Sequence, residues 1–343
     1  MHNDRHGIGC FCAMLEKYSI DPANFVSLTA EAIAAPSDLA ASYTVGLWNA
    51  ADIDSAVAPT LAPDDPLVGW QFDVLNLSGA LNRVSGAGVR VGIVDDGVHH
   101  WHPDLAVNYD HTIDYDARAG DADAAAGFGD YHGTMVAGVI AAAADGAGTV
   151  GVAPDATIAG FRIGYGWNSS LAQVVDALDA AWQVADVVNN SWSYTSIFAD
   201  NFLNASYAAA GAALERGVTE GRDGLGTVFV FSAGNSRGQG GNVNDHNFQN
   251  SPYTFAVAAT DSHGAHASFS SPGSALLVAA PGVSVTTTDG NAGYAAVSGT
   301  SFSSPAVAGV VALMLEANED LGYRDVQEIL AHTARLTDAG GGD

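Results

Sequence analysis

Three residues that could act as a nucleophile, a base and a carboxylate partner of the base stand far apart in the sequence. Each lies at a junction between expected elements. Asp95 directly follows the apolar run 89–94, whereas His132 and Ser301 each open a helix-like stretch. A serine hydroxyl becomes a good nucleophile when an imidazole takes its proton, and a carboxylate can fix the imidazole tautomer and stabilise the imidazolium. These residue types therefore predict acyl transfer by an Asp-His-Ser triad, provided that the fold brings them together.

The sequence around Ser301 favours stabilisation of an oxyanion. The free backbone N–H groups and the positive dipole end of a helix N-terminus stabilise a negative charge that forms beside them. Pro305 follows four residues later, and proline is tolerated only near the start of a helix. We therefore expect a helix to begin close to Ser301.

The elements that would position these residues follow an alternating pattern. Apolar runs typical of buried strands span 89–94, 157–163, 184–190, 227–232 and 255–259, and helix-like stretches span 132–144, 171–184, 201–215 and 301–317. Alternation over about 250 residues predicts an α/β fold, with three α/β/α layers around a mostly parallel central sheet. Ligands of such sheets bind at the carboxyl ends of the strands, where Asp95 is expected.

A strongly acidic composition limits the partners of the chain. The 343 residues carry 11 Lys plus Arg against 38 Asp plus Glu, a formal net charge of −27. Nucleic acids and anionic lipids are bound by clustered cations, so we expect neither as a partner. Apolar residues make up 48% and charged residues 14%, which indicates a folded protein with a large core. The acidity fits simple solubility and binding of a hard cation equally well.

Cysteines and hydrophobic segments contribute little to the expected fold. Cys10 and Cys12 are the only cysteines and lie one residue apart, so no disulfide framework holds the fold. With His2 and His6 they form a candidate metal site, although an unimportant tail is the simpler interpretation. The N-terminal segment lacks the apolar run of a secretory signal peptide. The longest apolar stretch, 306–315, is about ten residues, too short for membrane insertion.

Four short blocks carry a resemblance that spans roughly residues 64–337. They are VGIVDDG around Asp95, HGTMVAG around His132, FSAGN ending at Asn235 and SGTSFSSPAVAG around Ser301. In this order they resemble the signature blocks of the subtilisin-like serine proteases (peptidase S8, subtilases), whose triad order is Asp, His, Ser. Asp95-Asp96-Gly97 and Ser191-Trp192 resemble the kexin-like branch, whereas Ala280-Pro281-Gly282 follows the bacterial subtilisin pattern.

The resemblance implies a serine endopeptidase that hydrolyses polypeptides through an acyl-enzyme intermediate. Asp95 would orient the imidazole, His132 would act as general base and then acid, and Ser301 would attack the scissile carbonyl. Asn235 and the backbone N–H of Ser301 would stabilise the oxyanion. The residues expected to bind an extended peptide substrate are Gly164, Gly166, Ser191, Trp192, Ser193, Ser232, Ala233 and Gly234. Kexins select basic side chains with acidic residues that have no clear counterpart in 193–197, so we do not expect dibasic specificity.

A structural Ca²⁺ site is expected from the resemblance and from loop chemistry. Asp65, Asp104 and Asp145 match family positions whose oxygens bind structural calcium. Backbone carbonyls of the 143–149 loop would complete the hard-oxygen ligand set that Ca²⁺ prefers. The acidic stretch 114–123 could form another site, but a solvated loop is the simpler interpretation.

Two other functions stay open from the sequence. His99, His100 and His102 could bind zinc or iron in a metal-dependent hydrolase, although this leaves the other blocks unexplained. A catalytically idle peptide-binding module would keep the same scaffold, because the sequence alone does not place the triad within hydrogen-bond reach. An α/β-hydrolase is disfavoured, because position 303 is Ser303 where the G-x-S-x-G elbow needs glycine.

The expected organisation has three parts. Residues 1–63 form an N-terminal extension and candidate pro-segment, 64–337 form the subtilisin-like peptidase domain, and 338–343 form a linker-like tail. Kexin-like enzymes usually continue into a β-rich domain, so the resemblance implies either a fragment that lacks a C-terminal β-rich domain or a minimal form of the enzyme. Family habit implies an extracellular or cell-surface location, although no signal peptide is recognisable.

Overall fold

The computed structural model describes residues 28–29, 44–45, 68–194 and 196–335. Within the N-terminal part, β1 (Leu28–Thr29) and β2 (Thr44–Val45) pair antiparallel. The rest of the expected extension, the cysteine pair, Asp65 and the expected tail 338–343 lie outside the described residues.

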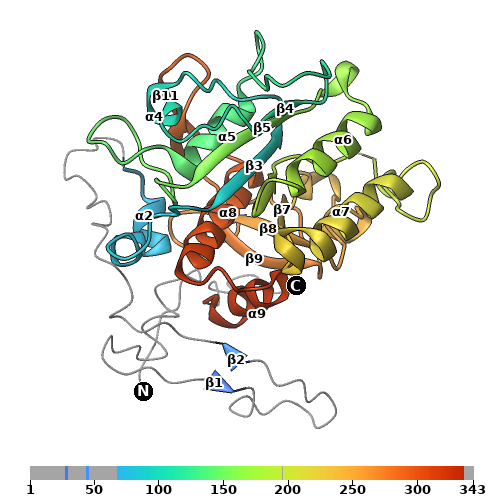
Figure 1. Cartoon of the computed structure of the whole chain (residues 1–343). Coiled ribbons are helices and arrows are strands. Elements are labelled where there is room, and N and C mark those ends of the chain that lie inside the picture. The colour runs from blue at the N-terminus through green and yellow to red at the C-terminus, as the bar shows by residue number, and fades with distance from the viewer. Residues whose placement is uncertain (1–27, 30–43, 46–67, 195, 336–343) are drawn as a thin grey trace.

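A parallel sheet forms the middle layer (Figure 1). Its seven strands run in the order β4-β5-β3-β6-β7-β8-β9, and every pairing between neighbours is parallel. The strands are β3 (Arg90–Asp95), β4 (Tyr115–Asp116), β5 (Thr157–Arg162), β6 (Val187–Asn190), β7 (Val228–Ser232), β8 (Thr254–Thr260) and β9 (Leu276–Pro281). All residues of β6 and β7 are buried, as is typical of strands covered on both faces.

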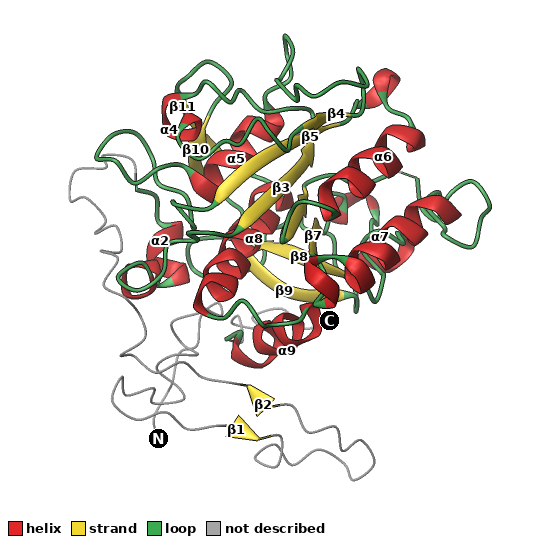
Figure 2. Cartoon of the chain, in the orientation of Figure 1, coloured by secondary structure: helices red, strands yellow, loops and turns green. Residues whose placement is uncertain are grey.

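Helices cover both faces of this sheet and enclose one apolar core on each (Figure 2). Val228 and Val230 of β7 belong to the core that α5 (His132–Ala141) and α8 (Thr300–Ala317) complete. Phe229 and Phe231 belong to the opposite core, because successive side chains of a strand point to opposite faces. That second core is completed by α6 (Leu171–Trp182) and α7 (Ala208–Glu220). The predicted three-layer α/β/α fold with a mostly parallel sheet is confirmed.

Shorter elements surround this frame. They are α2 (Gln71–Leu75), α3 (Leu77–Ala80), α4 (Pro103–Ala106), the antiparallel pair β10 (Val285–Thr288) and β11 (Tyr294–Val297), α9 (Tyr323–Thr333), and 3-10 turns at Gly166–Asn168, Arg222–Gly224, Arg237–Gln239 and Val243–Asp245. The short strand β4 and the edge strand β9 were not expected from the sequence.

The helix expected over 201–215 begins later, at Ala208. Asn201 and Asn204 each accept a hydrogen bond from the backbone N–H two residues later, at 2.9 and 3.1 Å. Such local bonds compete with helical hydrogen bonding. The chain therefore forms turns before it enters α7.

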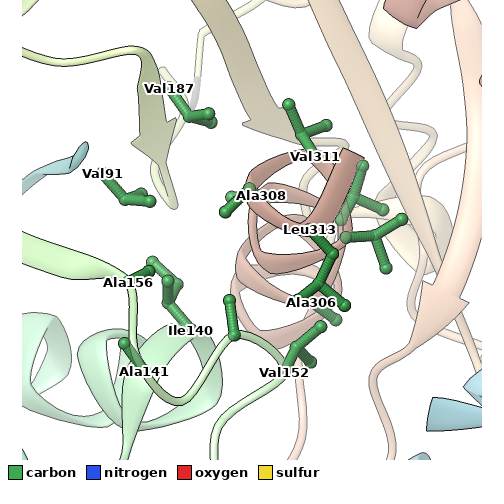
Figure 3. Close-up of a cluster of buried hydrophobic side chains, with 14 of the residues drawn as sticks. Val91, Ile140, Ala141, Val152, Ala156, Val187, Ala306, Ala308, Val311 and Leu313 are labelled. Atoms are coloured by element: carbon green, nitrogen blue, oxygen red, sulfur yellow. The ribbon is translucent and has the colours of Figure 1, made fainter. Parts of the chain in front are cut away.

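The helix α8 passes through the centre of the core. Figure 3 shows Ala308, Val311 and Leu313 of this helix among side chains of the sheet and of α5, including Val187 and Ile140. By length and composition α8 could span a membrane, and it extends well beyond the apolar stretch expected from the sequence, but 83% of it is buried inside the protein. Its apolar character is therefore explained by the core, which also fixes the position of its first turn.

Replacement of Leu313 by alanine is expected to lower the free energy of unfolding by about 2–5 kcal/mol. The Leu313 side chain is 0% exposed, so truncation leaves a cavity in the packed core. Chemical denaturation would measure the change. The matched control is Leu203→Ala, at a leucine that is 95% exposed, with an expected change within about 0.5 kcal/mol. Equal effects of the two substitutions would contradict this description of the core.

Candidate active site

The structure brings Asp95 and His132 into contact. Asp95 ends β3 and is 0% exposed, and His132 is the first residue of α5. The His132 Nδ1 atom lies 2.9 Å from Oδ1 and 3.0 Å from Oδ2 of Asp95. An ionised carboxylate only accepts hydrogen bonds, so Nδ1 carries the proton and donates it. Nε2 of a neutral His132 is then left as the basic nitrogen.

A second carboxylate, that of Asp96, caps the N-terminus of α5 by hydrogen bonds. Its Oδ2 accepts a hydrogen bond from the backbone N–H of His132 at 3.2 Å, and its Oδ1 accepts one from Gly133 at 2.7 Å. Only glycine fits at position 133, because a Cβ there would lie 2.3 Å from the carbonyl oxygen of Gly97. This role of Asp96 was not predicted from the sequence, where the residue stands out only as part of the Asp95-Asp96-Gly97 motif. The second acidic residue before Gly97 was the one feature of the sequence that could have indicated this role in capping α5.

The two acids and the imidazole perturb one another. Burial and the charge of Asp95 raise the pKa of Asp96 to about 7, against the opposing effect of its amide hydrogen bonds. Desolvation lowers the pKa of His132, but the charge and hydrogen bond of Asp95 and the charge of Asp96 outweigh it and raise that pKa to about 9. The imidazole is therefore a stronger base than an exposed histidine.

Ser301 is held against the residue that follows β6. Its Oγ donates a hydrogen bond to the carbonyl of Ser191 at 3.2 Å, and its own carbonyl accepts one from the Ser191 hydroxyl at 2.8 Å. The second bond has a simple cause, because Pro305 lacks the N–H that would bond the Ser301 carbonyl within the helix. Asn189 and Ser304 hold the same Ser191 hydroxyl at 2.9 and 3.0 Å.

His132 and Ser301 lie at the same edge but are not hydrogen-bonded. The rings of His132 and Phe302, the residue after Ser301, have centroids 5.8 Å apart. Within the described part of the chain, no hydrogen bond joins His132 to Ser301. Catalytic hydrogen bonds are often long in the absence of substrate and tighten in the complex. The arrangement is therefore compatible with proton transfer between the two residues.

Asn235 lies beside the first turn of α8. Its Oδ1 accepts hydrogen bonds from the backbone N–H and the hydroxyl of Thr300, at 2.9 and 3.0 Å. Since the oxygen faces these donors, the Nδ2 group is left to donate elsewhere. Nδ2 lies 3.4 Å from the place that a Cβ would take at Gly299. This amide and the N–H groups at the helix start form a pair of donors suited to an oxyanion.

The residues expected to bind a peptide surround this point, at the carboxyl ends of β5, β6 and β7. Gly164 and Gly166 follow β5, Ser191, Trp192 and Ser193 follow β6, and Ser232, Ala233 and Gly234 end β7 or follow it. Since β5, β3, β6 and β7 are neighbours in the sheet, all three segments lie along one edge with Asp95. A Cβ at Gly234 would lie 3.5 Å from the Ser193 hydroxyl, so two of the segments face each other.

Gln249 links these two facing segments, and the sequence analysis missed it. Its side-chain amide donates to the carbonyls of Trp192 and Ser232, each at 3.2 Å, and the residue is 1% exposed. The Trp192 side chain is 9% exposed and packs on Phe231 and Phe248, with ring centroids 5.3 and 5.0 Å away. Trp192 can therefore offer a substrate its backbone, while its ring belongs to the core. No local motif distinguished Gln249 from other glutamines.

Two of the expected calcium ligands, Asp104 of α4 and Asp145 of the loop after α5, lie near Tyr294. Asp104 accepts hydrogen bonds from the backbone N–H of Thr149 at 2.9 Å and from the Tyr294 hydroxyl at 2.8 Å. Burial, the hydrogen bond to Asp104 and the charges of Asp104 and Asp145 raise the pKa of Tyr294, so both carboxylates lie near this phenol. Each Asp104 oxygen keeps a free lone pair, and the Asp145 carboxylate lies on an exposed residue. These carboxylate oxygens are suitable ligands for a hard cation. Among the described residues, however, no three or more His, Cys, Asp or Glu side chains lie close enough together to hold a metal ion.

The three clustered histidines turn to different partners. His102 bonds the carbonyl of Gly293 at 3.0 Å, His100 lies 3.5 Å from a carboxylate oxygen of Asp123, and His99 packs edge-on against Trp101. They do not converge on a common point as zinc ligands would. The acidic stretch 114–123 is likewise engaged with protein groups, because Asp114 accepts a bond from Tyr109 and Asp116 pairs with Arg162.

Comparison with known sequences identifies relatives. The profile of the subtilase family, peptidase S8, matches residues 86–342. Human proprotein convertase subtilisin/kexin type 7 is 34% identical over 277 residues, which cover 76% of this chain and 35% of that protein. Kexin from Saccharomyces cerevisiae is 33% identical over 315 residues, which cover 80% of this chain and 36% of kexin. The chain spans about a third of the length of these curated relatives.

Solved structures agree with these relatives. A cold-adapted subtilisin-like serine proteinase superposes with a TM-score of 0.60 at 27% identity, covering 73% of this chain and 83% of its own. A protease from Pseudoalteromonas arctica gives a TM-score of 0.65 at 26% identity, covering 80% and 93%. Sequence, fold and the arrangement at the sheet edge point the same way, and the chain belongs to the subtilase family of serine proteases.

Proposed function

We propose that this chain is a serine endopeptidase whose triad is Asp95, His132 and Ser301. The observation that carries the proposal is the buried Asp95–His132 pair at the carboxyl end of β3, with the start of α8 beside it. Asp95 orients the imidazole and stabilises the imidazolium, which is the role a carboxylate has in this chemistry. Acyl transfer uses such a pair to activate a hydroxyl, which favours an enzyme over a peptide-binding module.

The proposed reaction proceeds in two halves. As Ser301 Oγ attacks the scissile carbonyl carbon, its proton passes to His132 Nε2, and the carbonyl oxygen becomes an oxyanion held by the Ser301 N–H and Asn235 Nδ2. Collapse breaks the C–N bond, and His132 returns the proton to the leaving amine, which leaves an acyl-enzyme on Ser301. Water then attacks the ester carbonyl and gives a proton to His132, and His132 passes that proton to Ser301 Oγ as the bond to the acyl group breaks. The carboxylic acid product leaves, and the Ser301 hydroxyl is regenerated.

The proposed substrate is an extended polypeptide. Gly164 to Gly166 and Ser191 to Ser193 would pair with its backbone as flanking strands, because both segments continue from strands of the sheet. The pocket for the side chain before the scissile bond would lie between 191–193 and 232–234. Dibasic specificity is not part of the proposal.

Three further proposals rest on the resemblance to the family. Residues 64–337 would form the peptidase domain between an N-terminal extension and a tail, with a β-rich domain to follow. The protein would act in an extracellular or cell-surface setting. Asp104 and Asp145, together with Asp65, would hold a structural Ca²⁺ that ties the loop 143–149 to the start of the domain.

Ser301→Ala is expected to abolish peptide hydrolysis, with a loss in kcat of about 10⁶-fold, a size known from subtilisin itself rather than from this geometry. The reason is that alanine has no hydroxyl to attack the carbonyl, and the neighbouring hydroxyls of Thr300 and Ser304 are engaged with Asn235 and Ser191. Hydrolysis of a denatured protein and labelling by a phosphonylating reagent would be measured together. Ser303→Ala, at a buried neighbour on the same helix, is the control and should still be labelled. Wild-type protein that neither cleaves nor takes up the label would refute the proposal.

The pH profile of kcat/KM is expected to have an acid limb with its midpoint above the ordinary imidazole pKa of 6.5. His132 must be neutral to accept the Ser301 proton, and its pKa is raised in the folded protein, so activity is lost as pH falls through that raised value. Asp95→Asn removes the charge responsible and should move the midpoint down while reducing kcat. A wild-type midpoint at or below 6.5 would contradict the electrostatics described above.

Calcium is expected to raise the melting temperature of the protein, because a ligand that binds only the folded state adds about 2.7 kcal/mol of stability at 100 times its Kd. Differential scanning calorimetry over a Ca²⁺ titration would measure the shift. Asp145→Asn should abolish most of it. Asp123→Asn is the control, since this exposed acid lies outside the proposed site. An unchanged melting temperature in wild-type protein would exclude the site.

A further inference from the structure

Tyr165 makes a contact that the triad chemistry does not require. Its hydroxyl lies 2.9 Å from Oδ1 of Asp95. The same oxygen accepts the backbone N–H of Asp96 at 2.8 Å and lies 2.9 Å from His132 Nδ1. Three donors therefore converge on one oxygen of a carboxylate that is 0% exposed.

The backbone places Tyr165 for this contact. It follows β5, which pairs with β3, so it leaves the sheet next to Asp95. It lies between Gly164 and Gly166, and the positive φ of 58° at Gly166 turns the chain away after it. The ring of Tyr165 meets the ring of His132 edge-on, with centroids 6.3 Å apart, and the residue keeps 37% of its surface exposed. Tyr165 thus forms part of the wall between the buried pair and the solvent.

The direction of this hydrogen bond follows from the charges around it. Burial and the charges of Asp95 and Asp96 raise the pKa of the Tyr165 phenol well above its ordinary value. The phenol therefore stays protonated wherever the enzyme would work, and it donates to the carboxylate. A hydrogen bond to an ionised group is about twice as strong as one between neutral groups.

We propose that Tyr165 is a positioning residue of the triad, whose hydroxyl holds the Asp95 carboxylate and takes up part of its charge. This inference rests on the proposed function. A carboxylate oxygen that already accepts a strong hydrogen bond stabilises a neighbouring imidazolium less. Tyr165 therefore lowers the pH at which His132 becomes a free base, and it extends activity toward neutral pH.

The charged groups that act on His132 are two carboxylates, and Tyr165 offers one of them a neutral hydrogen-bond donor. From the end of β3, His132 faces Asp95 and Asp96. From α8 it faces Phe302, which carries no charge. From β5, Arg162 donates a hydrogen bond through Nε to the backbone carbonyl of Asp96 at 3.1 Å. Its two terminal nitrogens are paired with Asp130 at 2.7 Å and Asp116 at 2.9 Å, which offset its charge. The phenol is thus a neutral side-chain donor that takes up part of the charge of Asp95 beside the imidazole.

The test is Tyr165→Phe, which keeps the ring and removes the hydroxyl. The midpoint of the acid limb in the pH profile of kcat/KM should move up by about 0.5–1 pH unit. At a fixed pH below the midpoint, kcat/KM of the variant should therefore be about 3- to 10-fold lower than that of the wild type. The control is Trp167→Phe in the same turn, at a residue fully exposed to solvent, which should leave the midpoint unchanged. A Tyr165→Phe enzyme with lower activity but the wild-type midpoint would reduce the tyrosine to a structural role and overturn the inference.

A second measurement separates this inference from the proposed function. The titration of His132 can be followed by NMR of ¹⁵N-histidine-labelled protein, assigned with a His132→Gln variant, and it does not depend on turnover. An upward shift of the His132 midpoint in Tyr165→Phe supports the inference even if the wild-type chain cleaves no peptide, in which case only the proposed function fails. Identical His132 midpoints in wild type and Tyr165→Phe overturn the inference even if the enzyme is active.

Discussion

The contact between Asp95 and His132 depends on burial, and the rest of the site depends on that contact. A carboxylate that is 0% exposed would be costly alone, and here it is compensated by donors from His132, Asp96 and Tyr165. The strand that ends at Asp95 is buried on both faces, so the carboxylate cannot move toward water without disrupting the sheet. The imidazole is thereby held in one tautomer and one orientation, which general-base chemistry needs.

Ser301, the proposed nucleophile, is positioned from a different part of the fold, by a helix that is buried along most of its length. Pro305 removes a helical hydrogen bond from the first turns of α8, and the freed carbonyl of Ser301 bonds Ser191 at the end of β6. The hydrogen bond that Pro305 removes from the helix is thus replaced by one that joins α8 to the end of β6. Because the Ser191 carbonyl also accepts a hydrogen bond from the Ser301 hydroxyl, one residue positions both the backbone and the side chain of the proposed nucleophile.

The frame of this protein was predictable from its sequence, since strands buried on both faces leave continuous apolar runs and helices follow them. The residues of the proposed triad were predicted for a related reason, because each stands where a strand ends or a helix begins, and Asn235 was predicted from the family resemblance. Gln249 and Tyr165 were not. Their roles depend on contacts between segments distant in sequence, such as the 2.9 Å bond from Tyr165 to Asp95, and no local pattern encodes which neighbour a loop side chain will meet. The late start of α7 shows the same limit on a smaller scale, because two asparagine turns outweighed helix propensity.

The net charge of −27 and the electrostatics of the triad act over different distances. Exposed charges more than about 8 Å apart are largely screened at physiological ionic strength, whereas buried charges are screened much less. The imidazole therefore responds mainly to Asp95 and Asp96, which are 0% and 7% exposed, and to the donors that share their charge. The wider acidic surface can still raise the encounter rate with cationic stretches of a polypeptide. Surface charge and base strength are thus largely separable in this fold, because the acidity of the surface can change with little effect on the pKa of His132.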